Sequence, residues 1–323
     1  MNANPLHGKI MKPKGKRKSV DGLRTRTFPV PPEGFDPLSA PKAKLAYHGI
    51  APRPDKNKER KLYKNWLSIY SKKLTHIVPE FFSYGVDGQR PNAAPRKVRE
   101  GPTNSETWSG VAVVPPVGDA FTLITGRWII PHPKQPPGVA AGQVCHCASW
   151  IGMDGWVGQK SELLQAGTDA TIQVQDSPVQ RKVWAWWEWI PDGPVAIRNL
   201  PVTSGDKMAC LIHSTGPRTA RIYIVNLSSR THSSHQVTIP KGATFTGSSA
   251  EWIVEAPLLN DGPPTVLANY GTVNFTESFA RSAKKKVICP ASGQTIDMYD
   301  SVGAPPVSVG SIGAAKIVTV MYK

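Results

Sequence analysis

The chain contains 323 residues, and its 39 Lys and Arg outnumber its 23 Asp and Glu, giving a formal net charge of +16. This length allows one large domain or two smaller ones with a real core, and a hydrophobic content of 40% excludes a wholly disordered chain. No apolar run approaches the roughly 18 residues of a membrane-spanning helix, so we expect no membrane insertion. Four Cys are too few for a disulfide scaffold.

The positive charge is concentrated in the first third of the chain. Residues 1–101 hold 22 Lys and Arg against 8 Asp and Glu, a net +14, which leaves 17 against 15, a net +2, for residues 102–323. We therefore expect a basic N-terminal extension over 1–101 and a nearly neutral domain over 102–323. A basic segment can attract nucleic acid, but that function would depend on the extension alone and is not the expected one.

Within the extension, composition predicts an arm followed by a helix. Residues 1–54 are Pro-rich and show no sustained periodicity, which is typical of a flexible arm. Over residues 55–74, Leu62, Trp66 and Tyr70 recur at i+4, the spacing of a single apolar helix stripe. We expect one amphipathic helix there.

From Trp108 onward, short segments rich in Val, Ile, Thr and Trp are separated by Gly, Pro, Asp and Asn. About eleven such segments without a helical pattern predict an all-β fold, an antiparallel β-sandwich or barrel. The expected strands are 108–115, 120–131, 145–152, 161–166, 181–190, 207–213, 220–226, 235–239, 250–255, 269–275 and 315–322.

Several of these strands carry polar side chains on one face. Because side chains alternate along a strand, Trp186 shares a face with Glu188, and Glu255 shares one with Glu251. An aromatic groove with a few polar groups is typical of a cleft for an extended polymer; the alternative is an ordinary solvent face. If the faces line one curved sheet, the groove holds Trp150, Gln165, Trp186, Glu188 and Glu255.

Six short motifs follow one another across about 104–323. They are Trp108-Ser109-Gly110, Trp150-Ile151-Gly152-Met153-Asp154-Gly155, Leu163-Leu164-Gln165-Ala166-Gly167, Trp186-Trp187-Glu188-Trp189-Ile190-Pro191, Gly205-Asp206 and Ala250-Glu251-Trp252-Ile253-Val254-Glu255. In this order and spacing the chain resembles the glutamic peptidases (eqolisins, family G1, formerly A4). The resemblance implies a concanavalin A-like β-sandwich of two seven-stranded sheets and an acid endopeptidase acting on polypeptides.

The resemblance also implies a catalytic dyad of Gln165 and Glu255. A Glu carboxylate can take a proton from water and return it to the leaving amine. A Gln amide can orient the water through its C=O and donate N–H to the developing oxyanion, without the repulsion between two carboxylates. By the same resemblance the substrate groove is shaped by Trp150, Asp154, Trp186 and Glu188.

A carbohydrate-binding or glycoside-hydrolysing sandwich is the main alternative, because an aromatic groove suits sugar stacking and Glu188 and Glu255 could serve as its two carboxylates. Gln165 within its own motif favours the peptidase, since a mechanism with two carboxylates has no use for it.

A metal site is a weaker interpretation. It would use Cys145-His146-Cys147 with Cys210 and His213, but no CxxC pair or HExxH motif accompanies them. We therefore expect neither metal nor cofactor, and the pattern leaves open the state of Cys145, Cys147, Cys210 and Cys289.

The charge division and the resemblance together predict that 1–101 is an inhibitory prosegment. Its positive charge would be attracted to ionised carboxylates of the groove at neutral pH, and the helix over 55–74 would anchor it there. The expected enzyme is a monomer. Fungal members of the resembling family are acidic and secreted with a signal, whereas the first thirty residues here are basic and lack a signal's apolar stretch. Secretion is thus expected from the resemblance alone.

Overall fold

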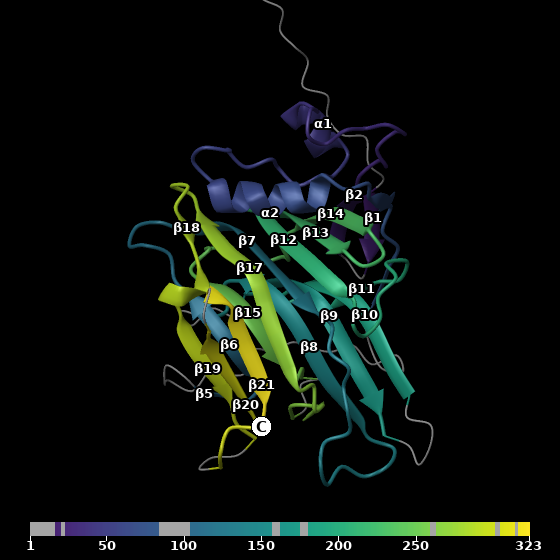
Figure 1. Ribbon diagram of the computed structural model, residues 1–323, viewed down its shortest axis with the longest axis vertical. Coiled ribbons are helices and arrows are strands. Elements are labelled where there is room, and N and C mark those ends of the chain that lie inside the picture. Colours follow the sequence, from purple (N-terminus) through teal and green to yellow (C-terminus); the bar gives the residue numbers. More distant parts are fainter. Residues whose placement is uncertain are drawn as a thin grey trace, which may run out of the picture.

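The computed structural model describes residues 17–20, 23–83, 104–156, 162–174, 180–258, 263–300, 304–313 and 316–323. This part of the chain consists mainly of antiparallel strands, with two α-helices, α1 (Lys42–Tyr47) and α2 (Arg60–Tyr70), before the sandwich (Figure 1). The predicted all-β class is confirmed, and each of the eleven expected segments contains a strand. Neither described helix is long and apolar enough to cross a membrane.

One of the two large sheets, which we call the front sheet, contains eight strands paired in sequence in the part of the chain that the structure describes. Its strands lie in the order β4 (Phe81–Ser83), β11 (Val195–Ile197), β10 (Gln180–Trp189), β9 (Leu164–Gln173), β8 (Val144–Met153), β15 (Ala250–Glu255), β6 (Trp108–Val113) and β19 (Gln294–Met298). These pairs are antiparallel, and the short β16 (Val266–Leu267) pairs in parallel with the start of β8.

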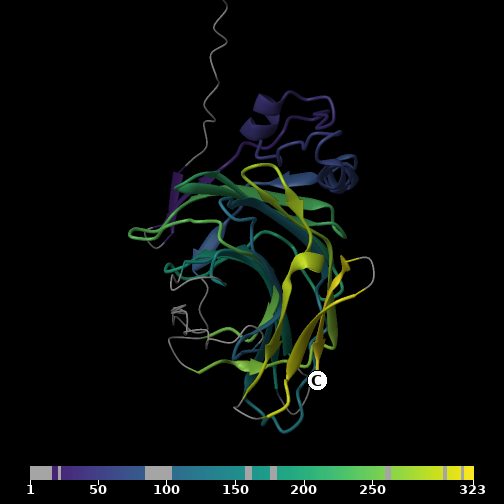
Figure 2. The ribbon, with the colours of Figure 1, turned by 90° about the vertical axis from the view of Figure 1, so that its left-hand side faces the viewer.

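The second sheet, the back sheet, packs behind the first. It contains β18 (Val287–Ile288), β17 (Thr272–Ser282), β7 (Phe121–Ile129), β12 (Lys207–Gly216), β13 (Thr219–Asn226) and β14 (Thr231–Thr238). At its edge, β14 pairs with β2 (Leu23–Thr27), which pairs with β1 (Arg17–Val20), and with β3 (Thr75–Ile77). A smaller group joins the two sheets from β19 to β17 and contains β5 (Asn104–Ser105), β20 (Ser308–Ile312) and β21 (Val318–Tyr322). Figure 2 shows the resulting curved, two-layered body.

The main core lies between the sheets because alternate residues of each strand point inward. Ile151, Trp187 and Trp252 of the front sheet are fully buried there against Ile212 and Ile222 of the back sheet. The opposite face of the front sheet carries a second, smaller apolar cluster that includes Trp150, Trp186 and Ile253. The front sheet is therefore buried on both faces, and the smaller cluster underlies the candidate site.

The N-terminal segment is ordered, which corrects one expectation. The predicted helix over 55–74 is present as α2, and its stripe of Leu62, Trp66 and Tyr70 is buried. A flexible arm is wrong for the described residues 23–54, which contain β2 and α1. Proline-rich composition hid isolated apolar side chains of this stretch that pack together with α2 without any regular spacing, among them Leu45 and Ile50.

The helix also docks elsewhere than expected. Trp66 and Tyr70 pack with Tyr223 and Val225 of β13, on the outer face of the back sheet, where both helices lie (Figures 1 and 2). The prediction that the apolar stripe anchors this helix at the groove is therefore wrong. The stripe instead buries apolar side chains on the outer face of the back sheet.

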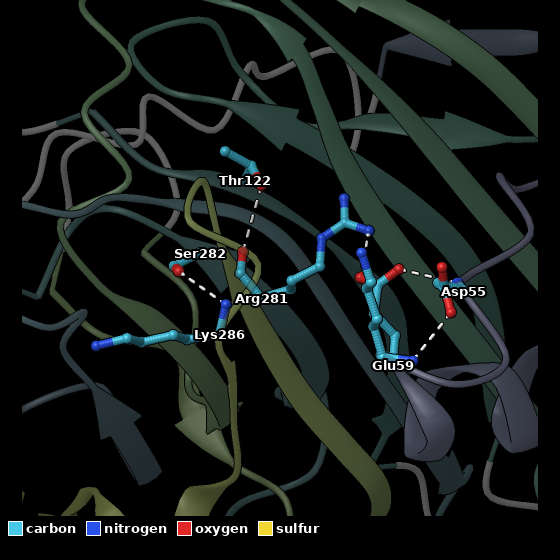
Figure 3. Close-up of polar contacts among 7 residues, drawn as sticks. Asp55, Glu59, Thr122, Arg281, Ser282 and Lys286 are labelled. Carbon is cyan, nitrogen blue, oxygen red and sulfur yellow. Dashed lines mark hydrogen bonds and ion pairs between the residues drawn. The ribbon is translucent and has the colours of Figure 1, made fainter.

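A buried ion pair fastens the start of α2 to β17 (Figure 3). The Arg281 Nη1 atom lies 3.0 Å from the Glu59 Oε1 atom, and the backbone N–H of Asp55 donates to Glu59 Oε2 at 3.0 Å. With β2, β3 and β4 also paired into the two sheets, strands from both sides of the expected boundary at residues 101 and 102 share the same sheets.

Candidate active site

The front-sheet face that points away from the main core gathers the predicted site residues, and we call it the site face. Residues paired across antiparallel strands carry their side chains on the same face. Two neighbouring rows therefore cross it, one formed by Trp186, Gly167, Trp150 and Ile253 and the other by Glu188, Gln165, Gly152 and Glu251. Sequence alternation had placed Trp186 and Glu188 on one face of β10, and Glu251 and Glu255 on one face of β15. Strand pairing brings these faces together.

Glu255 lies at the end of β15 and is held by two indoles. Trp108 Nε1 donates to its Oε1 at 3.1 Å, and Trp150 Nε1 donates to its Oε2 at 2.7 Å. The two rings meet edge to face with their centroids 5.0 Å apart. Each carboxyl oxygen thus has one donor, and the side chain is fixed in an aromatic pocket while keeping some contact with solvent.

Gln165 and Glu188 form a second polar pair, on the neighbouring strands β9 and β10. They are direct cross-strand partners, and Gln165 Nε2 donates to Glu188 Oε2 at 2.6 Å. Both side chains are buried, with 3% and 4% of their surface exposed. Neither Gln165 Oε1 nor Glu188 Oε1 has a hydrogen-bond partner among the described residues, so each member of the pair keeps one unused acceptor.

Burial makes both carboxyls hard to ionise. It raises the pKa of Glu255 to about 7, while the indole N–H groups of Trp108 and Trp150 oppose the shift. Burial, followed by the negative charge of Glu255, raises the pKa of Glu188 to about 8, against the opposing hydrogen bond from Gln165. The negative charge of Glu255 therefore makes Glu188 harder to ionise.

Tight packing under the site face depends on Gly167. A Cβ atom there would lie 2.2 Å from the carbonyl oxygen of Ser149 and 2.6 Å from the Cβ atom of Trp150, far inside normal contact. The glycine lets β9 pass close to Trp150, whose indole carries one of the hydrogen bonds to Glu255. Trp150 and Trp186 are both buried in the apolar cluster of this face.

Asp154 lies apart from these pairs. It follows the end of β8 with a positive φ of 70°, and its carboxylate accepts hydrogen bonds from the backbone and hydroxyl groups of Thr246 and Ser248. These four bonds occupy the carboxylate and hold the loop before β15. Asp154 also acts at a distance, because after burial its charge is a further cause of the strongly raised pKa of the fully buried Glu251.

Sequence patterns alone missed Trp108 as a partner of Glu255, because β6 and β15 are far apart in the chain and their register is a tertiary feature. They also missed a buried pair on the site face, in which His146 Nδ1 lies 3.0 Å from Asp169 Oδ2. Alternation along Gln165, Gly167 and Asp169 was the available signal for the second case.

The Cys-His-Cys motif divides between the two faces of β8. Cys145 and Cys147 are buried in the main core, whereas His146 points to the site face. Among the residues that the structure describes, no group of three or more His, Cys, Asp or Glu could hold a metal ion. Cys210 is also in the main core, and none of the four thiols forms a disulfide.

The assembled site contains a glutamate with raised pKa, an amide and aromatic walls on one sheet of a β-sandwich, which is typical of a hydrolytic enzyme. Residues 106–322 match the model of the peptidase A4 family, so the chain belongs to this family and is a glutamic-type peptidase. Aspergillopepsin-2 of Aspergillus niger is 26% identical over 205 residues, 58% of this chain and 69% of that protein.

Solved structures agree in fold. Scytalido-glutamic peptidase, crystallised with a transition state analog inhibitor, matches with a TM-score of 0.56 and 18% identity over 68% of this chain and 99% of that one. SCP-B, a member of the eqolisin family in complex with the tripeptide Ala-Ile-His, matches with a TM-score of 0.52 and 16% identity over the same shares. The family match favours the peptidase over the carbohydrate and nucleic-acid alternatives.

Proposed function

We propose that the chain is an acid endopeptidase that hydrolyses peptide bonds in polypeptides with a Gln165/Glu255 dyad. The observation that carries the proposal is the environment of Glu255, a carboxyl with one indole donor on each oxygen, on the same sheet face as Gln165. A fixed carboxyl with a perturbed pKa is what a general base requires.

In this mechanism Glu255 first acts as a base. Its ionised carboxylate takes a proton from a water molecule, which attacks the carbonyl carbon of the substrate. The protonated Glu255 then gives the proton to the leaving amine as the C–N bond breaks. The indoles of Trp108 and Trp150 hold the carboxyl in one orientation through both steps.

Gln165 stabilises the oxyanion of the tetrahedral intermediate. One of its amide N–H groups is engaged by Glu188, which fixes the side chain and leaves the second N–H and the carbonyl oxygen for substrate and water. Because the pKa of Glu188 is raised to about 8, Glu188 is neutral in acid and does not repel the developing oxyanion.

We also predict that kcat/KM is highest at acid pH. Glu255 must be ionised to act as a base, so its pKa must fall below about 7, its value in this structure. Burial is the largest cause of that value, and hydration of the pocket would remove part of it. The measurement is the dependence of kcat/KM on pH. An optimum above pH 7 would contradict an acid peptidase and agree with a base that stays buried.

Two substitutions test the dyad. We expect Glu255→Gln and Gln165→Ala each to lower kcat/KM by about 100-fold or more, because each removes a positioned base or an oxyanion donor. Gln173→Ala is the matched control, since Gln173 lies at the far end of the same strand and should keep wild-type activity. Activity above one tenth of wild type in either dyad variant, with thermal unfolding unchanged, contradicts the assignment.

Residues 1–101 are proposed as a prosegment on the strength of their net +14 charge and the initial resemblance. Both helices of the described segment pack on the outer face of the back sheet, and β4 pairs with β11 at the edge of the front sheet. Charge attraction at the groove therefore does not account for how the segment is held. The test is to incubate the full chain at acid pH and determine the N-termini of the products. A chain that stays uncut and fully active contradicts the proposal. A monomeric state and secretion also stay predictions.

A further inference from the structure

We propose that His146 and Asp169 form a charged pair that sets the protonation of Glu255, and that both are positioning residues for the peptidase reaction. The inference rests on the proposed function of Glu255 and deepens it, because it assigns a role to two residues outside the dyad.

The pair is buried and joined by one short contact, while His146 Nε2 has no hydrogen-bond partner among the described residues. His146 Nδ1 lies 3.0 Å from Asp169 Oδ2, and the side chains are only 1% and 3% exposed. Strand alternation brings His146 to the site face while Cys145 and Cys147 point into the main core. An ionised carboxylate is stable at such a depth only with a strong partner, and an imidazolium supplies a charge-assisted hydrogen bond.

The pair lies beside Glu255 through a shared neighbour. Ala148 of β8 is the cross-strand partner of Asp169 on β9 and of Glu255 on β15. Asp169 and Glu255 therefore lie on either side of Ala148, on the same face of the sheet. Burial is the main cause of the raised pKa of Glu255, and the negative charge of Asp169 adds to it. A positive charge on His146 would offset that contribution.

Two further buried carboxyls lie on the described part of the site face. Glu188, and also Glu251 farther along the sheet, have raised pKa values and stay neutral in the acid range. Lys182 of β10 is exposed to solvent. The Cys147 thiol, on the opposite face of β8, has a raised pKa and remains neutral. The ionisation of Glu255 in acid should therefore respond to His146 and Asp169.

The experiment measures kcat/KM against pH for the full chain, with a fluorescence-quenched peptide as substrate. The acid limb of this profile is the range in which kcat/KM falls as Glu255 becomes protonated. Asp169→Asn removes a negative charge near Glu255, so the acid limb should move to lower pH by roughly 0.5–1 unit. His146→Gln removes a positive charge beside Asp169, so the limb should move to higher pH by a similar amount. The double variant should return close to wild type, and Thr171→Val, an uncharged change on the same face, should leave the limb in place.

Shifts of the acid limb in opposite directions in the two single variants support the pair. A purely structural role would lower kcat/KM in both variants without shifting the acid limb. Limbs that stay in place, or that move in the same direction, overturn the inference. If Asp169→Asn does not fold, His146→Gln decides alone, since an unmoved or lowered limb overturns the inference. If Glu255→Gln is inactive but the acid limbs of Asp169→Asn and His146→Gln do not move, only the role of the His146–Asp169 pair is overturned. If Glu255→Gln is active, the dyad itself is overturned.

Discussion

Glu188→Gln converts a buried carboxyl into an amide of nearly the same shape, so it isolates the effect of ionisation on stability. Burial and the charge of Glu255 raise the pKa of Glu188 to about 8 in the folded chain, against about 4.3 for an unfolded Glu. A group with a raised folded pKa stabilises the fold when protonated, and this contribution is lost as pH rises through the folded pKa.

The size of the effect follows from the two pKa values. Relative to a side chain that cannot ionise, Glu188 lowers the free energy of unfolding by about 5 kcal/mol at pH 8 and by about 1 kcal/mol at pH 5. Gln cannot ionise, and its carbonyl can still accept the hydrogen bond from Gln165 Nε2. The free energy of unfolding of the variant, relative to that of the wild type, should therefore increase by about 4 kcal/mol from pH 5 to pH 8.

Urea unfolding, followed by Trp fluorescence at both pH values, measures this gain as a change in the free energy of unfolding. Glu33→Gln is the control, because Glu33 is exposed and its replacement should have the same small effect at pH 5 and pH 8. If Glu188→Gln differs from wild type equally at the two pH values, Glu188 ionises normally in the folded chain and the electrostatic account of the site is wrong.

Three further predictions concern the packing around the sheets. Glu59→Ala should lower the free energy of unfolding by about 3–5 kcal/mol, because it leaves Arg281 buried and unpaired; a loss below 1 kcal/mol in urea unfolding would refute a buried ion pair. Trp66→Ala should lower it by about 3–5 kcal/mol, and an unchanged midpoint would mean that α2 does not pack on the back sheet. Gly167→Ala should lower stability by about 1–3 kcal/mol and reduce kcat/KM, because its Cβ meets the Ser149 carbonyl; full activity would show that the site tolerates the shift.

The β-domain was predictable because its signals are local. Alternation along each strand depends only on neighbouring residues, so it located eleven of the strands and placed Gln165, Glu188 and Glu255 on polar faces. Short strands such as β11, β16 and β18 were not predicted. The helix stripe of Leu62, Trp66 and Tyr70 was readable for the same reason, since its period is local to one element. Short motifs in fixed order indicated the peptidase family before any fold was known.

Contacts between distant parts of the chain were not predictable in this way. The docking of Trp66 on β13, the Glu59–Arg281 ion pair and the burial of the Pro-rich stretch before α2 depend on surfaces that exist only after the sheets have formed. The indole donors of Glu255 depend on the register of three strands separated by many residues. Local sequence sets the period and face of each element, whereas strand pairing and apolar burial decide which faces meet, and these determine the pKa values of the site.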